Sequence, residues 1–124
     1  MNADILIDKK ICKTNYKNKI DGIKLLNNIN SEAIKTAFFD PQYRGVLDKL
    51  KYGNEGKSRG KARHDLQQMS EETIIEFINE IDRVLLPSGH LFLWVDKFHL
   101  CTGVADWFKD TNFNLVDMIT WGKG

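Results

Sequence analysis

Apolar residues recur at helical spacing between residues 70 and 85, where every third or fourth position is hydrophobic. This spacing predicts an amphipathic helix with one broad apolar face. Ser70 is a favourable N-cap residue. The next two residues are glutamates, whose negative charge is favourable near the positive end of a helix dipole. Pro87-Ser88-Gly89 interrupts the pattern. We therefore predict a helix that starts after Ser70, stops before Pro87 and packs on an apolar surface.

Short apolar runs elsewhere predict strands, because they are rich in β-branched and aromatic residues and lie between turn residues. The alternation of such runs with helical segments indicates an α/β fold with a mostly parallel sheet flanked by helices. Strands are expected at residues 35–39, 90–95 and 112–121, weaker strands at 5–7 and 11–16, and short helices at 21–28 and about 99–110.

Length and composition favour a single soluble globular domain covering residues 1–124. The chain is 42% hydrophobic and 28% charged, within the range of ordinary folded proteins. Cys12 and Cys101 form no Cys-x-x-Cys or Cys/His cluster, so neither a disulfide scaffold nor a metal site is expected. No apolar run approaches the roughly 20 residues that a membrane span needs. We expect a cytoplasmic protein with no membrane partner.

The small net charge of +1 conceals a basic segment at residues 44–64. Its glycines and scarcity of apolar residues predict a mobile surface loop. Such a loop is either simply solvated or a contact for a polyanion. Its basic residues are Arg44, Lys49, Lys51, Lys57, Arg59, Lys61 and Arg63.

Asp40-Pro41-Gln42-Tyr43 follows the strand expected at residues 35–39. Ligands of parallel sheets bind at the carboxyl ends of strands, where this tetrapeptide should lie. An aspartate can accept a hydrogen bond from an amino group, proline fixes the backbone, and a tyrosine ring can stack on a planar base. The alternative is an ordinary turn after a strand, for which Asp and Pro are common residues.

The order of landmarks resembles that of amino-directed DNA methyltransferases with a D-P-P-Y signature. FFDPQY is followed by the basic segment, the amphipathic helix, Leu-Pro-Ser-Gly at residues 86–89, an apolar strand, and Trp121-Gly122-Lys123 in place of the family's W-x-K. Asp21, 19 residues before Asp40, matches an acidic landmark before a short helix. The resemblance implies part of a Rossmann-like methyltransferase fold.

The resemblance also implies roles for individual residues. Asp40 and the Pro41 carbonyl would hold the amino group of a flipped base, adenine by the identity of Asp40, and Tyr43 would stack on that base. Gln42 departs from the family's second proline. Asp21 would contact S-adenosylmethionine, or would otherwise only cap a helix. The residues expected to contact phosphates of double-stranded DNA are Arg44, Lys57, Arg59, Lys61 and Arg63.

The family's cofactor motif, F-x-G-x-G after a strand, does not occur in the chain. In the permuted branch of the family the signature comes first and the cofactor motif last. We therefore expect a truncated chain equivalent to the first half of such an enzyme, with weak or absent binding of S-adenosylmethionine. A complementary chain or a homo-oligomer would complete the sheet. The alternatives are an inactive nucleic-acid-binding remnant, and a methyltransferase acting on cytosine amine, RNA or a protein amide.

Overall fold

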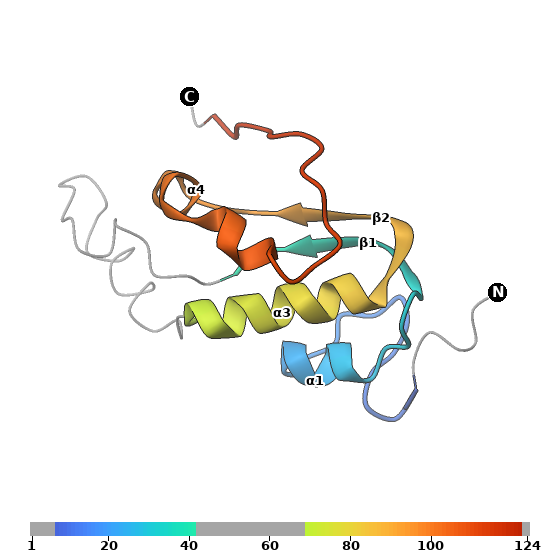
Figure 1. The fold of residues 1–124 in the computed structure, drawn as a ribbon. Coiled ribbons are helices and arrows are strands. Elements are labelled where there is room, and N and C mark those ends of the chain that lie inside the picture. The colour runs from blue at the N-terminus through green and yellow to red at the C-terminus, as the bar shows by residue number, and fades with distance from the viewer. Residues whose placement is uncertain (1–6, 42–68, 123–124) are drawn as a thin grey trace, which may run out of the picture.

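The computed structural model describes residues 7–41 and 69–122, which form a small parallel sheet with helices packed on it (Figure 1). The chain passes from a helix into the first strand, and then through a long helix into the second strand and a helical segment. In chain order the elements are α1 (Gly22–Asn27), β1 (Ile34–Phe39), α3 (Glu71–Val84), β2 (Leu85–Leu93), α4 (Lys97–Thr102) and the 3-10 helix η2 (Val104–Phe108).

Strands β1 and β2 pair in parallel, and α3 belongs to the crossover between them. Phe38 is paired with Phe92 and Phe39 with Leu93. Parallel neighbours need such a crossover, most often a helix, so this is a βαβ arrangement. The α/β class and the parallel sheet predicted from the sequence are confirmed.

Helix α3 covers one face of the sheet with the apolar stripe that the spacing predicted. Its side chains Ile74, Ile78 and Ile81 are buried and pack with Phe39 and Trp107. At its start the backbone N–H of Thr73 donates to Oγ of Ser70 over 3.2 Å, which confirms the predicted N-cap. The pKa of Glu72 lies below its usual value because its carboxylate accepts hydrogen bonds from its own backbone N–H and from the Ser70 side chain.

The Pro87-Ser88-Gly89 turn lies inside β2 rather than between the helix and the strand. Helix α3 already ends at Val84, and Leu85 begins the strand as the partner of Ile34. The register then shifts, because Thr36 is paired with His90. A Cβ at Gly89 would lie 2.9 Å from the Leu86 carbonyl oxygen and 3.0 Å from that of Lys35. Glycine therefore allows the two backbones to approach at this irregularity.

Residues 112–121 do not form the predicted strand. They are extended without ladder hydrogen bonds, and side chains such as Leu115 and Ile119 are 89% and 80% exposed. An apolar run becomes a strand only beside another strand, and the described part of the sheet contains β1 and β2 alone.

Two other expectations also need correction. Residues 11–16 form turns and irregular structure rather than a strand. Of the strand expected at residues 5–7, residue 7 lies in a bend, and residues 5 and 6 lie outside the described ranges. The helix expected at residues 99–110 is divided into α4 and η2 at Gly103. The φ of Gly103 is 157°, and its N–H bonds to the His99 carbonyl oxygen over 3.2 Å, which closes α4.

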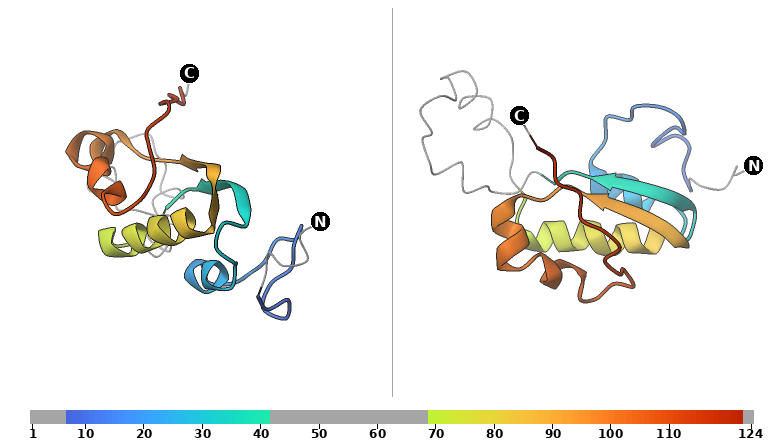
Figure 2. Two further views of the ribbon diagram at one scale, coloured as in Figure 1. Left: turned by 45° about the vertical axis from the view of Figure 1, so that its right-hand side comes forward. Right: turned by 90° about the horizontal axis from the view of Figure 1, so that it is seen from above.

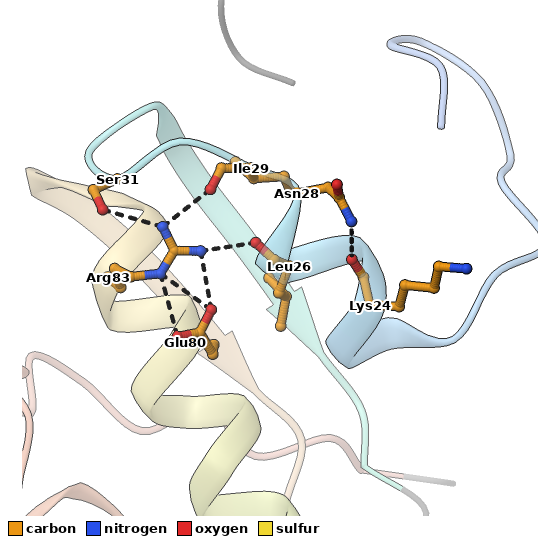
Figure 3. A network of polar contacts seen from close by, with 7 residues as sticks. All are labelled: Lys24, Leu26, Asn28, Ile29, Ser31, Glu80 and Arg83. Carbon is orange, nitrogen blue, oxygen red and sulfur yellow. Dashed lines mark hydrogen bonds and ion pairs between the residues drawn. The ribbon is translucent and has the colours of Figure 1, made fainter. Parts of the chain in front are cut away.

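Arg83 joins the end of α3 to the end of α1 and to the turn before β1 (Figure 3). Its Nη2 donates to the Leu26 carbonyl oxygen over 2.8 Å, and its Nη1 donates to that of Ile29 over 3.0 Å. Further bonds go to Oγ of Ser31 and to both carboxylate oxygens of Glu80. The planar guanidinium suits this arrangement, since its five donors point in fixed directions toward several acceptors at once.

Replacement of Arg83 by lysine should therefore destabilise the fold although the charge is kept. A single ammonium cannot reach Leu26, Ile29 and Glu80 together, so partly buried carbonyl groups lose a partner. We expect Arg83→Lys to lower the free energy of unfolding by about 1–3 kcal/mol in urea titrations. Lys24→Met, which removes an exposed cation on α1, is the matched control and should have little effect. Equal stability of both variants would contradict this role of Arg83.

Candidate functional site

Both strands leave the sheet at the same edge, and Asp40 and Pro41 lie there. The backbone N–H of Trp94 donates to the Phe39 carbonyl oxygen over 3.0 Å, so pairing continues to the last residue before Asp40. Beyond this point β2 leads into Asp96 and α4. The structure thus brings Asp40 and the start of α4 to the carboxyl edge of a parallel sheet, the usual place for a ligand site in this class of fold.

Asp40 is exposed between two buried neighbours. Phe39 is 8% exposed and packs on the α3 side of the sheet, and Pro41 is buried as well. A residue before proline favours extended backbone, which continues the inward and outward alternation of β1 by one position. Among the described residues none forms a hydrogen bond with the Asp40 carboxylate. Within residues 7–41 and 69–122, this acceptor is therefore not committed to a hydrogen bond.

The ring of Phe77 on α3 links the neighbourhood of Asp40 to the start of α1. It stacks on the Phe39 ring with centroids 5.1 Å apart and planes inclined by 22°. The same ring also lies against Gly22, where an added Cβ would be 2.6 Å from Cε1 of Phe77. Phe77 therefore contacts both the residue next to Asp21 and the residue next to Asp40.

Asp21 is the N-cap of α1. Its Oδ1 accepts the backbone N–H of Lys24 over 3.0 Å, and the residue is exposed. The capping role considered from the sequence is thus present. Contact of Asp21 with a cofactor stays a prediction.

Several predicted site residues lie outside the described ranges. Gln42 and Tyr43 follow directly after Pro41, and the loop expected at 44–64 also falls there. This applies to every residue expected to contact DNA, namely Arg44, Lys57, Arg59, Lys61 and Arg63. Their roles remain predictions.

The sequence analysis missed the pairing of Asp96 with His99 beside this edge. Oδ1 of Asp96 accepts the backbone N–H of His99 over 2.9 Å and also lies 2.7 Å from its Nδ1. His99 is buried, and its ring packs against Trp107 with centroids 5.5 Å apart. The spacing D-x-x-H after an apolar strand was the available signal, because an N-cap acts on the third residue that follows it. The pair fixes the start of α4 at the carboxyl edge.

The described residues show neither a metal cluster nor a membrane helix. Within residues 7–41 and 69–122 there is no group of three or more His, Cys, Asp or Glu side chains that could hold a metal ion. No helix in these ranges is both long and apolar enough to cross a membrane.

The site lies at the carboxyl edge of a parallel sheet in an α/β protein, and its exposed carboxylate has no hydrogen-bond partner among the described residues. The chain is similar to the type II methyltransferase M.HhaII of Haemophilus parahaemolyticus, with 62% identity over 110 residues. The match covers 88% of this chain and 48% of the relative, so the chain spans about half the length of that relative. No protein-family model matches the chain, and no solved structure matches it.

The likeness to M.HhaII supports the resemblance to methyltransferases found in the sequence. A two-stranded parallel sheet with flanking helices is also consistent with part of an α/β methyltransferase fold.

The contact between Gly22 and Phe77 predicts that Gly22→Ala destabilises the chain. Alanine is the better helix former by roughly 1 kcal/mol, but its Cβ would overlap the Phe77 ring, which is held by Phe39. We expect a net loss of about 1–3 kcal/mol in the free energy of unfolding, measured with urea. Gly122→Ala is the control, because a Cβ there meets nothing within 4 Å.

A second substitution tests the cause of this loss. Phe77→Leu should cost less stability in the Gly22→Ala background than in the unmodified chain, because the smaller side chain makes room for the added methyl group. Strictly additive effects of the two substitutions would contradict a direct contact.

Proposed function

We propose that this chain forms the base-holding part of an S-adenosylmethionine-dependent DNA adenine methyltransferase of a restriction-modification system. The observation that carries the proposal is the exposed Asp40 carboxylate at the carboxyl edge of the sheet, without a hydrogen-bond partner among the described residues. The 62% identity to a type II methyltransferase supports it. A cytoplasmic location follows from a DNA substrate.

In the proposed site Asp40 and Pro41 act on the exocyclic amine of a flipped adenine. The Asp40 carboxylate and the Pro41 carbonyl oxygen each accept one amine hydrogen, and the ring of Tyr43 stacks on the base. These contacts turn the amine out of conjugation with the ring, so that its nitrogen lone pair becomes available as a nucleophile. The nitrogen would attack the methyl carbon as the bond from that carbon to sulfur breaks, and the proton that the nitrogen then loses would pass to the Asp40 carboxylate or to solvent. Catalysis by these residues consists of orientation and charge placement.

S-adenosylmethionine, when bound, supplies the methyl group and its departing sulfur. Asp21 is placed to contact this cofactor, because its exposed carboxylate lies at the start of α1, next to Gly22 and the Phe77 ring that stacks on Phe39. Oδ1 of Asp21 caps the helix, and Oδ2 has no hydrogen bond within the described part of the chain. The glycine motif expected for tight binding does not occur in the sequence. Strong binding therefore needs further polypeptide.

The basic residues between 44 and 63 would contact phosphates of double-stranded DNA and position the duplex. Such contacts carry no sequence information.

The proposal predicts that methyl transfer depends on Asp40. The assay uses this chain joined to the part of M.HhaII that the match does not cover, with radiolabelled S-adenosylmethionine and duplex DNA. Asp40→Ala should lower kcat/KM by about 100-fold or more, since an acceptor for the reacting amine is lost. Asp40→Asn, which keeps one acceptor oxygen, should lose less. Asp110→Ala removes another exposed aspartate as the control and should leave the rate unchanged.

Mass analysis of the methylated products, covering both nucleosides and protein, identifies the methylated group. N6-methyladenine is the expected product. N4-methylcytosine, methylated RNA or a methylated protein amide would instead show that the substrate is not adenine in DNA. Undiminished methyl transfer by Asp40→Ala would contradict the proposed role.

Phosphate contact by the basic residues predicts a salt-dependent affinity for DNA. The slope of the logarithm of the binding constant against the logarithm of salt concentration changes by about 0.9 for each phosphate contact. We expect Arg59→Ala and Lys61→Ala each to reduce the slope by about that amount, in fluorescence anisotropy titrations with duplex DNA. Lys109→Ala is the control, an exposed cation outside the basic segment. The same slope in all variants would exclude Arg59 and Lys61 from the DNA interface.

A second candidate function is a nucleic-acid-binding remnant without activity. The missing cofactor motif favours it. Salt-dependent binding of DNA together with no methyl transfer by the joined protein would support this alternative.

A further inference from the structure

The face of the sheet that points away from α3 carries three exposed aromatic side chains, Phe38, Phe92 and Trp94. They are 70%, 41% and 40% exposed, respectively. The Phe38 and Phe92 rings stack with centroids 5.0 Å apart and planes inclined by 13°, and the Trp94 ring lies 6.2 Å from that of Phe38. We call this cluster the aromatic face.

The register of the strands explains why these rings share a face. Phe38 is paired with Phe92, and the next pair, Phe39 with Leu93, packs toward α3. Because successive side chains alternate, the pair Phe38 and Phe92 must point to the opposite side. Figures 1 and 2 show α3 and α1 on the same side of the two strands, away from this face.

An uncovered aromatic surface is unusual for a parallel sheet. Such sheets are normally buried on both faces by helices. Contiguous exposed apolar side chains of this kind mark a surface for another polypeptide. The rings already stack on one another, so little side-chain ordering would oppose association.

We propose that the aromatic face is the docking surface for the other half of the methyltransferase, namely polypeptide equivalent to the part of M.HhaII outside the 110 matched residues. This inference rests on the proposed function. The matched residues make up 48% of the relative, so about as much again remains to cover the sheet. A helix with an apolar stripe is the element that fits a flat aromatic surface on a parallel sheet.

The position of the aromatic face also favours this occupant over a second copy of the chain. Phe38 precedes Asp40 by two residues, and the Trp94 N–H bonds to the Phe39 carbonyl oxygen, so an occupant of this face would lie beside Asp40. Methyl transfer needs a cofactor site at that position. A second copy would not supply the glycine motif, because the sequence contains none.

Co-expression tests the docking. The tagged 124-residue chain is produced together with the untagged remainder of M.HhaII, and the amount that co-purifies is measured. Phe38→Asp should reduce co-purification at least about tenfold, because a carboxylate would be buried at the centre of the contact. Tyr16→Asp is the control, because this aromatic residue is 66% exposed and lies before α1, and the variant should retain the wild-type amount. Circular dichroism checks that both variants are folded.

Hydroxyl-radical labelling gives a second measurement that does not need separate folding of the two parts. Oxidation of Phe38 and Phe92 is compared between the 124-residue chain and the protein in which it is joined to the remainder of M.HhaII. At least about fivefold protection in the joined protein is expected for rings that become covered. Tyr16, which is 66% exposed and lies before α1, provides the internal reference.

The outcomes separate this inference from the proposed function. Unprotected Phe38 and Phe92 in a joined protein that methylates DNA through Asp40 would overturn the docking and leave the function intact. Protection without methyl transfer would support the docking and count against the function. Self-association of the chain that Phe38→Asp abolishes would assign the face to a second copy and overturn the inference. Equal co-purification of the wild type and Phe38→Asp would also overturn the inference.

Discussion

The packing of α3 on one face of β1 and β2 is the interaction on which the remaining structure depends. Two parallel strands cannot be joined by a tight turn, so their pairing is stable only when the crossover between them is anchored to the sheet. Ile74, Ile78 and Ile81 provide this anchor, with Phe39 on the strand side. Arg83 then adds the polar part, because it binds the carbonyl groups at the end of α1. Hydrophobic burial and the several hydrogen bonds of one guanidinium group together hold the helices against the sheet.

The same packing determines what the carboxyl edge presents. Phe39 is drawn inward to the ring of Phe77, and the alternation of the strand leaves Asp40 outside. On the same side of the sheet, away from α3, alternation leaves Phe38 exposed beside Phe92. The candidate site and the aromatic face are thus two consequences of one register. The proposed function depends on the first of these features, and the proposed docking depends on the second.

The candidate site was only partly predictable. Its position at the end of a strand followed from an apolar run that ends in Asp40 and Pro41, and a cap at Asp21 followed from the start of a helical pattern. The pairing of Asp96 with His99 was not predicted. His99 packs against the Trp107 ring, and this contact was not evident from the sequence because Trp107 belongs to a different element. The contacts of Phe77 with Gly22 and Phe39 likewise join three elements.

The sequence by itself determined the local elements: the helix after Ser70, the short helix after Asp21 and the two apolar strands. These depend on the spacing of apolar residues and on caps, which act within a few positions of the chain. Only the tertiary structure decided that residues 85–89 belong to β2, that residues 112–121 remain unpaired and that one face of the sheet is open. The physical reason is that a strand is defined by a neighbour distant in sequence. The hydrophobicity of a side chain indicates that it can be buried, but it does not indicate which surface will cover it.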